Sequence, residues 1–299
     1  MKKLLAFITL LLVGVLIWFS FIKTYDHQIN FEVNLPAGSF YHMLLNSNQW
    51  SKKDIRIIDK VLFKSIQMES SINKHDFQLL WELENINNTS AQVHLYYKNK
   101  NESLKERFKS LFGQSNNLDT LKVISQSFKQ KALSFSKRFQ LEINGVETLE
   151  KSVFMYVQDQ VTRTEMAESM IRNNPILFQK RKDSSVTKNG KTFTKVEHWN
   201  PKTDSITFKY AFPVEPKSHY PTDQFVKVDT LHKEKAIKAT FHGNYSISDV
   251  AWIALHHYAI QNNINIQYSP VEIYHDNPNY GGNSKQWKAE IYMPIKINN

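Results

Sequence analysis

Two short segments near the end of the chain each place a carboxylate two residues before a tyrosine. They are Glu272-Ile273-Tyr274 and Glu290-Ile291-Tyr292. Alternate residues of a strand share one face, so each carboxylate would stand beside its tyrosine. Aromatic rings around a carboxylate suit a flat, apolar cation, because the rings supply contact area and cation–π attraction while the anion supplies charge pairing. The alternative is that Glu290 is an ordinary solvated acid on an open sheet face.

The pattern of the flanking residues predicts which face these groups occupy. The last strand alternates two sets, which are Trp287, Ala289, Ile291 and Met293 on one side and Lys288, Glu290 and Tyr292 on the other. The apolar set should pack under helices, which leaves Glu290 and Tyr292 on the opposite, concave side. On the neighbouring strand Val271 and Ile273 are apolar, so we expect Glu272 and Tyr274 on that concave side as well.

The sequence holds no recognised catalytic or metal-binding motif. The absence of cysteine excludes disulfides, thiolate metal sites and cysteine nucleophiles. With only 8 glycines, no phosphate-binding loop or dinucleotide fingerprint occurs. His256 and His257 are adjacent and would diverge by about 100° on a helix, so they cannot chelate one metal ion. We predict no metal, no cofactor and no catalytic residue; in an enzyme, Glu290 would be the general base.

The composition predicts a folded chain of two domains with a basic surface. The chain has 299 residues, of which 41% are hydrophobic and 13% aromatic, enough to fill two cores. Lysine and arginine number 38 against 28 acidic residues, but the lysines are scattered and form no dense run. This pattern is typical of a solvated surface beside a membrane, and we expect no nucleic-acid partner.

Residues 4–22 form an apolar segment that would span about 28 Å as a helix, close to the hydrocarbon thickness of a bilayer. Lys2 and Lys3 precede it, which places the N-terminus in the cytoplasm by the positive-inside rule. A cleaved signal peptide is the alternative, but the segment is long and ends in the bulky residues 18–22. We predict a single-pass anchor in the cell membrane, residues 1–25, that contacts lipid through residues 4–22 and leaves the remainder extracytoplasmic.

The next block, residues 26–137, shows strand-like alternation followed by helical spacing. The predicted elements are a strand at His27–Pro36, a short helix from Ala37 to Leu45 that finishes near Trp50, strands at 77–83 and 91–97, and a long helix over Leu118–Phe135. The polar segment 85–90 should form the hairpin turn between the two strands.

This order of elements resembles the START-like helix-grip fold of the polyketide cyclase (SRPBCC) group. The resemblance rests on Val33–Phe40, Asn48-Gln49-Trp50 and Leu104–Gly113. It implies a curved sheet that wraps a long terminal helix around an apolar cavity. Many members carry a second tryptophan soon after the first, and here Ser51-Lys52-Lys53 follows instead.

The last block, residues 138–299, contains an internal repeat. The matching segments are Lys195–Pro201 with 270–278, and Ile206–Val214 with Trp287–Ile295. Each pair follows a helical segment, and each helix follows a strand. We therefore predict two strand–helix–strand–strand units, about 138–215 and 222–297, which share a core because neither could bury its sheet alone.

The second unit resembles the GyrI-like domain, the effector-binding domain of AraC- and MerR-type bacterial multidrug regulators. Four motifs carry the resemblance, and they are Phe241–Tyr245, Ala251–Leu255, Val271–Tyr274 and Ala289–Pro294. It implies that Glu290 matches the acid that ligands meet in that family. The ligand site would then consist of Glu290, Tyr292, Glu272 and Tyr274, with Trp252 in the core or the pocket wall. Membrane-anchored proteins that join a START-like domain to a GyrI-like domain are a recognised arrangement that this chain resembles.

The repeat also predicts a partner for Glu290. Lys209 occupies the equivalent position in the first unit, and Trp199 matches Tyr274, so we predict that both also belong to the ligand site. If a pseudo-twofold axis relates the units, Lys209 and Glu290 could approach each other across the cleft. Their pairing would neutralise the anion and weaken the preference for cationic ligands.

These features together predict an α+β protein with a transmembrane helix, a START-like helix-grip domain and a tandem GyrI-like domain. The leading functional prediction is a membrane-tethered protein that binds a small apolar or cationic molecule, as sensor or scavenger, without catalysis. No helix-turn-helix precedes the GyrI-like block, which argues against a transcription regulator. The alternatives are a hydrolase of reactive cyclopropane-type compounds, as some GyrI-like relatives are, with Glu290 as base, and an envelope module for an unidentified protein partner.

Overall fold

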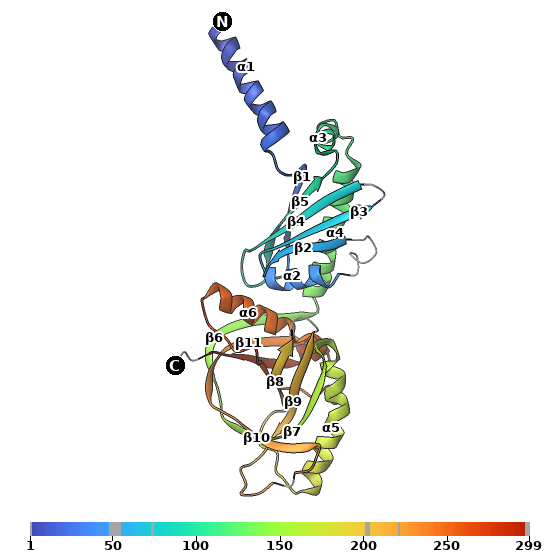
Figure 1. Ribbon diagram of the computed structural model, residues 1–299. Helices are drawn as coiled ribbons and strands as arrows, with labels where there is room; N and C mark the ends of the chain where they lie inside the picture. Colours follow the sequence, from blue (N-terminus) through green and yellow to red (C-terminus); the bar gives the residue numbers. More distant parts are fainter. Residues whose placement is uncertain (1, 48–54, 73–74, 201–203, 221, 297–299) are drawn as a thin grey trace. The chain divides into compact units, whose positions relative to one another are not determined.

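The computed structural model describes residues 2–47, 55–72, 75–200, 204–220 and 222–296. The chain divides into two compact units, Met1–Ser134 and Phe135–Asn299. Each unit is a mixture of helices and one antiparallel sheet (Figure 1), as expected for an α+β protein. The motif Asn48-Gln49-Trp50 and the predicted end of the short helix lie outside the described residues.

The first unit begins with an exposed apolar helix. α1 (Lys2–Ile17) continues into one π-helical turn, η1 (Trp18–Ile22). Among the described residues this is the one helix long and apolar enough to cross a membrane, with a mean hydropathy of 2.7 and none of that window buried. A signal sequence has the same length and composition, so anchoring stays a prediction.

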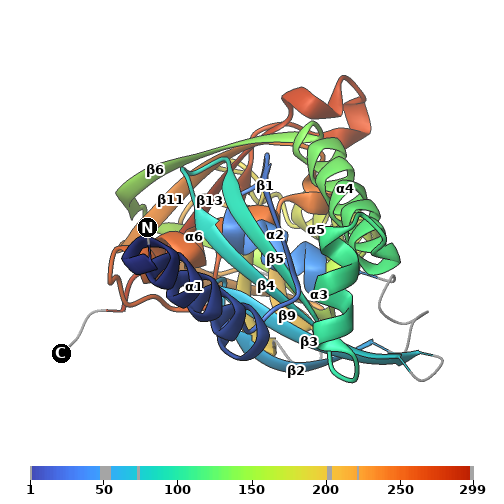
Figure 2. The same cartoon turned by 90° about the horizontal axis from the view of Figure 1, so that it is seen from above.

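Alternating side chains build a five-stranded antiparallel sheet in the order β1-β5-β4-β3-β2 (Figure 2). Its strands are β1 (His27–Val33), β2 (Ile55–Val61), β3 (Ser65–Ile72), β4 (His75–Asn85) and β5 (Ala91–Asn99). The predicted hairpin joins β4 to β5, with Asn85 opposite Ala91. Strands β2 and β3 were not predicted from the sequence. β2 is exposed along almost its whole length and so lacks the alternation that marks a half-buried strand.

Aromatic side chains form the core of the first unit. Its other helices are α2 (Ala37–Leu45), α3 (Ser103–Leu111) and α4 (Asn116–Ser136), the last of which is the predicted long helix. Phe128 of α4 packs on Trp81 of β4, with ring centroids 5.3 Å apart, and Phe40 of α2 lies 6.3 Å from Phe128. All three side chains are fully buried. The closer assignment to the START-like helix-grip fold stays a prediction.

The second unit contains an eight-stranded antiparallel sheet in the order β10-β7-β9-β8-β12-β13-β11-β6. Its strands are β6 (Phe139–Leu149), β7 (Ser152–Thr162), β8 (Phe193–Asn200), β9 (Ser205–Pro213), β10 (Val226–Leu231), β11 (Glu234–Gly243), β12 (Val271–Tyr274) and β13 (Lys288–Pro294). The predicted strand–helix–strand–strand order is present twice, as β7–α5–β8–β9 and β11–α6–β12–β13. The two sets meet where β8 pairs with β12, and β10 and β6 extend the sheet at its two edges.

Helices α5 (Met166–Asp183) and α6 (Val250–Gln261) pack on one face of this sheet. A capping box formed by Thr162 and Glu165 precedes α5 in the short helix η3 (Arg163–Glu165). Helix α6 is apolar on almost every side and is buried along most of its length. A second, smaller apolar cluster covers the opposite face of the sheet and includes Phe154, Phe193 and Val271. The central strands are therefore covered on both faces.

The strand register corrects one prediction about the faces. Glu272 lies opposite Ile291, and Tyr274 lies opposite Ala289, so both point to the helix side together with the apolar set of β13. Glu290 points to the other face, as predicted. The prediction that Glu272 and Tyr274 share a face with Glu290 is therefore wrong. The apolar residues of β12 do not reveal the helix side, because apolar side chains are buried on both faces of this strand.

Candidate ligand-binding site

A cavity of about 880 Å³ lies between the two repeats of the second unit, on the helix side of the sheet. Its aromatic lining consists of Phe178, Tyr210, Phe212, Tyr245, Tyr274 and Tyr280. Its basic and acidic lining consists of Arg181, Lys188, Lys191, His275 and Asp276. A concave site of this size with mostly apolar walls and a few polar groups is typical of small-molecule binding.

One face of α5 forms the first wall of the aromatic cavity. Met170, Asn174, Phe178 and Arg181 recur at three- and four-residue spacing, which aligns them along one side of the helix. The Tyr210 hydroxyl of β9 donates to Asn174 Oδ1 at 2.9 Å and joins this wall to the sheet. The first repeat thus supplies a helix face and the end of a strand.

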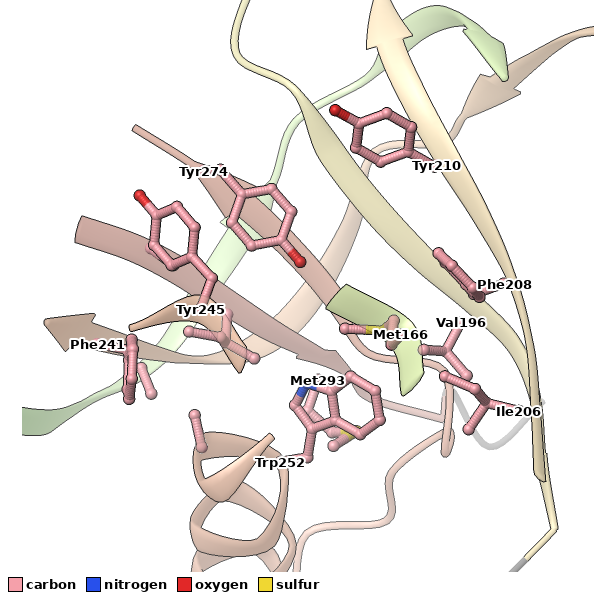
Figure 3. Close-up of a cluster of buried hydrophobic side chains, with 14 of the residues drawn as sticks. Met166, Val196, Ile206, Phe208, Tyr210, Phe241, Tyr245, Trp252, Tyr274 and Met293 are labelled. Carbon is pink, nitrogen blue, oxygen red and sulfur yellow. The ribbon is translucent and has the colours of Figure 1, made fainter. Parts of the chain in front are cut away.

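The second repeat supplies the facing wall. Tyr245, at the start of η4 (Tyr245–Ile247), packs on Tyr274 of β12 with ring centroids 4.8 Å apart. The Tyr245 hydroxyl donates to the Lys288 carbonyl oxygen at 2.7 Å, and burial raises the pKa of Tyr245. In Figure 3 the Tyr274 hydroxyl points into the buried cluster, whereas the Tyr245 hydroxyl points the other way. Both hydroxyls are hydrogen-bonded within the protein, so the apolar rings are what these two tyrosines can offer a ligand.

Directly behind Tyr274 lies a fully buried carboxylic acid, Glu272. Its Oε2 atom is 2.7 Å from Ser248 Oγ and 2.9 Å from the Tyr274 hydroxyl, and its Oε1 atom accepts a hydrogen bond from Trp252 Nε1. The pKa of Glu272 is raised to about 7. Burial is the main cause and the nearby Asp249 carboxylate adds to it, whereas the hydrogen bonds from Ser248, Tyr274 and Trp252 oppose the rise.

The hydrogen bonds around Glu272 are compatible with its neutral form. The Ser248 hydroxyl has one proton and two acceptors in reach, the Tyr245 carbonyl oxygen at 2.9 Å and Glu272. When Ser248 donates to the carbonyl, a protonated Glu272 can donate to Ser248 Oγ and still accept from Trp252. Glu272 therefore joins η4, α6 and β12 beneath the aromatic wall, without itself lining the cavity.

Glu290 lies on the opposite face of the sheet and is paired with cations. Its carboxylate oxygens are 3.1 Å from Lys288 Nζ, 3.4 Å from Lys238 Nζ and 3.3 Å from His275 Nε2. Burial alone would raise the pKa of Glu290, but Lys288, Lys238 and His275 together lower it. A neutralised carboxylate with a lowered pKa is a weak general base at neutral pH.

The predicted pair of Lys209 with Glu290 does not form. Lys209 Nζ lies 2.7 Å from Asp229 Oδ2 and 2.9 Å from Glu197 Oε1, and it stands 4.8 Å from the centre of the Tyr156 ring. Strands β8 and β12 separate β9, which carries Lys209, from β13. Lys209 therefore pairs with Asp229 and Glu197 and is separated from Glu290 by two strands.

The remaining predicted ligand residues are dispersed. Trp252 is fully buried and packs edge-to-face on Trp199, with ring centroids 6.1 Å apart. Tyr292 lies on the face opposite the cavity, where Lys238 Nζ stands 5.5 Å from its ring centre. Of the seven residues predicted to bind ligand, Tyr274 is the one found in the lining of this cavity.

Most residues in the lining of the cavity were not predicted from the sequence. The four-residue spacing of Met170, Asn174 and Phe178 was a detectable signal, because the helix itself was predicted. The segment 275–280 and Tyr245 gave no such signal, since they reach the cavity only through the fold. Across the described residues, no three His, Asp or Glu side chains converge as metal ligands would.

Comparison with known proteins gives distant structural likenesses. No protein-family model and no curated protein sequence matches the chain. The EcmrR C-terminal domain is 17% identical with a TM-score of 0.45, over 54% of this chain and 99% of that domain. SAV2435 bound to tetraphenylphosphonium is 15% identical with a TM-score of 0.36, over 52% and 94%. A hydrolase from Listeria innocua is 11% identical with a TM-score of 0.33, over 56% and 98%. Likenesses this distant assign neither a family nor a function.

Proposed function

We propose that this protein is a membrane-tethered binding protein that takes a small, largely apolar molecule into the aromatic cavity and does not transform it. The observation that carries the proposal is the cavity itself, of about 880 Å³ and with six aromatic rings in its lining. Aromatic rings in the lining of a cavity give a flat ligand apolar contact area. A sensor and a scavenger would both use such a site.

The closer assignments belong to the same proposal. The tandem repeat and the four sequence motifs support a GyrI-like effector-binding domain in the second unit. The order of strands and helices supports a START-like first unit. The exposed apolar helix of 21 residues, Lys2–Ile22, supports a single-pass anchor with residues 26–299 outside the cytoplasm.

The site offers less support for the two alternatives. Glu290, which a hydrolase would need as its base, lies on the face opposite the cavity and is neutralised by Lys288 and Lys238. A module for a protein partner would not need a hollow between the repeats. We therefore retain binding of a small molecule as the function that the geometry favours.

Binding can be tested with three probes that share a biphenyl group: 4-biphenylcarboxylate, 4-biphenylmethanol and biphenyl-4-methylammonium. The full chain in lipid nanodiscs is titrated with each probe by calorimetry, and empty nanodiscs supply the blank. At about 0.3 kcal/mol per heavy atom, a probe of this size should bind with Kd of about 0.1–1 mM. We expect at least one probe to bind.

A pair of matched variants locates the binding. Thr192→Trp places a large ring in the cavity lining, whereas Thr187→Trp makes the same change at an exposed threonine outside it. Binding that is lost in Thr192→Trp and retained in Thr187→Trp supports the proposal. Failure of all three probes to bind, or equal binding by both variants, would refute it.

Topology has its own test, which uses the absence of native cysteine. A cysteine introduced at the exposed Asn189 should react with a membrane-impermeant maleimide in intact cells. A cysteine introduced at Lys3 should react only after the cells are lysed. The reverse pattern would overturn the proposed orientation, and release of an N-terminally shortened chain would show a cleaved signal peptide.

A further inference from the structure

The aromatic cavity carries more positive than negative charge. Arg181, from the last turn of α5, and Lys188 and Lys191, from the segment before β8, contribute three cations to its lining. Asp276 contributes the one carboxylate in that lining. Its Oδ2 atom already accepts the backbone N–H of Lys288 at 2.7 Å. The charge of this lining is therefore opposite to the one expected for a site that binds cations.

The cations have no acidic partner in the described part of the chain. Their hydrogen bonds go to neutral oxygens, from Arg181 Nη1 to the Val186 carbonyl at 3.3 Å, from Lys188 Nζ to the Thr192 hydroxyl at 2.8 Å, and from Lys191 Nζ to the His275 carbonyl at 3.2 Å. No described carboxylate oxygen lies within 4.0 Å of any of the three. Arg181 Nε is buried and lacks a hydrogen-bond partner among the described atoms. Such groups can accept an anion without losing an existing ion pair.

Two of these cations stand on the aromatic walls. The Arg181 guanidinium is 5.4 Å from the centre of the Phe178 ring, and Lys188 Nζ is 4.7 Å from the centre of the Phe212 ring. Burial, followed by the charges of Arg181 and Lys191, lowers the pKa of Lys188. A bound anion would offset this repulsion, whereas a bound cation would increase it.

We propose that the ligand of the aromatic cavity is an aromatic organic anion, with its rings among the tyrosines and its carboxylate or sulfonate on Arg181, Lys188 and Lys191. This inference rests on the proposed function and gives it a ligand class. It also differs from the sequence prediction of a cationic ligand, which depended on Glu290 lying in the site.

The three biphenyl probes test the sign of the charge, because their apolar parts are the same. We expect the carboxylate to bind at least about 10-fold more tightly than the alcohol, since hydrogen bonds to charged groups contribute roughly 1.5–3 kcal/mol. The ammonium compound should bind more weakly than the alcohol. The preference for the carboxylate should fall in 0.5 M salt, because partly exposed charges are screened.

Charge-removing variants identify the residues responsible. Arg181→Gln and Lys188→Gln should each weaken binding of the carboxylate about 3–10-fold more than they weaken binding of the alcohol. Lys182→Gln removes the same charge from an exposed neighbour outside the lining and should change neither.

The outcomes separate this inference from the proposed function. If no probe binds, the proposed function fails and this inference fails with it. If the alcohol or the ammonium compound binds as tightly as the carboxylate, and Thr192→Trp still abolishes binding, the site exists and the anion inference alone is overturned. Equal effects of Arg181→Gln on the carboxylate and the alcohol would also overturn it, because a structural role would produce that result.

A separate observation concerns α3 (Ser103–Leu111), next to the end of the apolar helix. Arg107 of α3 is almost fully buried, and its Nε lies 2.7 Å from Asp26 Oδ1. Its Nη1 and Nη2 atoms donate to the carbonyl oxygens of Phe19 and Lys23 at 2.5 and 2.6 Å. Phe108 packs edge-to-face on Phe19, with ring centroids 5.6 Å apart. Helix α3 is therefore fixed to the last turn of the apolar helix.

One face of α3 is apolar although it is exposed. It carries Leu104, Phe108 and Leu111, and Phe112 follows directly after the helix; these residues are 44%, 46%, 66% and 75% exposed. They recur at three- and four-residue spacing and so form one stripe on the helix. Lys105 and Lys109 lie along one side of the stripe, and helices at the surface of a bilayer carry such lysines beside their apolar face.

We infer that α3 lies in the membrane interface, with this apolar stripe in contact with lipid. Phe19 of the proposed anchor contacts Phe108 of the stripe. A bilayer that surrounds the end of the anchor helix would therefore also contact the apolar stripe of α3. This second inference rests on the proposed anchor and is independent of the cavity.

Nitroxide labels on introduced cysteines test the position of α3 in nanodiscs. We expect a label at Leu111 to collide with oxygen, which dissolves in lipid, more often than with a water-soluble nickel complex. A label at Lys109, about 200° around the helix, should show the opposite preference. A label at Val13 in α1 serves as the lipid reference. Equal nickel accessibility at Leu111 and Lys109 would overturn the inference, and nickel accessibility at Val13 would overturn the anchor as well.

Discussion

The substitution Glu272→Gln should remove a pH-dependent destabilisation of the second unit. Glu272 is fully buried, and its pKa is raised from 4.5 to about 7, chiefly by burial. Between these two pH values the folded chain holds a proton that the unfolded chain has released. The stability of the wild type should therefore fall as the pH rises from about 4.5 to about 7, and level off above that.

The magnitude follows from the size of the shift. A difference of about 2.5 pKa units corresponds to about 3 kcal/mol in the free energy of unfolding. Glutamine is neutral at every pH and can keep the same geometry, because its amide can donate to Ser248 Oγ and its oxygen can accept from Trp252. We expect Glu272→Gln to match the wild type near pH 4.5 and to exceed it by up to about 3 kcal/mol at pH 8.

Hydrogen exchange of the full chain in nanodiscs measures the stability of the second unit around Glu272. Mass spectrometry of peptides that cover α6 and β12 reports the free energy of opening of this unit. The difference between wild type and variant at each pH removes the intrinsic pH dependence of exchange. Measurements at pH 5, 6, 7 and 8 should show a difference that grows with pH.

Glu290→Gln provides a control of opposite sign. The pKa of Glu290 is lowered, so its ionised form stabilises the fold above the unfolded pKa, and this contribution is lost as the pH falls. This variant should be less stable than the wild type at neutral pH and approach it in acid. A Glu272→Gln variant that is less stable than the wild type at pH 8, or a stability difference that does not change with pH, would refute the raised pKa of Glu272.

Three further predictions follow from the packing of the second unit. Gly243→Ala should lower the free energy of unfolding in urea by about 1–3 kcal/mol, because the added Cβ would lie 2.9 Å from Phe139 Cβ. Unchanged stability would contradict this and show that the backbone shifts to relieve the contact. Arg163→Gln should lower the free energy of unfolding by about 2 kcal/mol in the same assay, because it leaves Asp249 without its buried cation. A decrease below about 1 kcal/mol, as for an exposed ion pair, would contradict this prediction. Lys209→Gln should leave the affinity for every biphenyl probe unchanged in calorimetry, because its Nζ is occupied by Asp229 outside the cavity lining, and altered affinity would place it in the site.

Much of the architecture could be predicted because local patterns determine it. Alternation marked β4 and β5, and three- and four-residue spacing marked α4. The repeated order of elements in the second unit could be predicted because both repeats have a similar apolar pattern. The strand β2 was missed because both of its faces are exposed, so its sequence carries no signal of period two.

The site was predicted less well than the fold. Its residues had to be assigned to one of the two faces of the eight-stranded sheet, and apolar side chains are buried on both faces. Val271 and Glu272 are both fully buried, one on each face of β12. Neither periodicity nor hydrophobicity can distinguish these faces; the register with β13 does. The register places Glu272 behind the cavity and Glu290 on the face opposite to it.

The sequence alone determined that an apolar segment opens the chain, that two α+β blocks follow, and that the second block is a repeat. These properties depend on residues close together in the chain. Only the tertiary structure decided where a ligand could bind and which charge it would meet, since Arg181 and Lys188 come from one repeat and Tyr245 and Tyr274 from the other. The physical reason is that a cavity is formed by segments distant in sequence, and its charge is the sum of groups that only folding brings together.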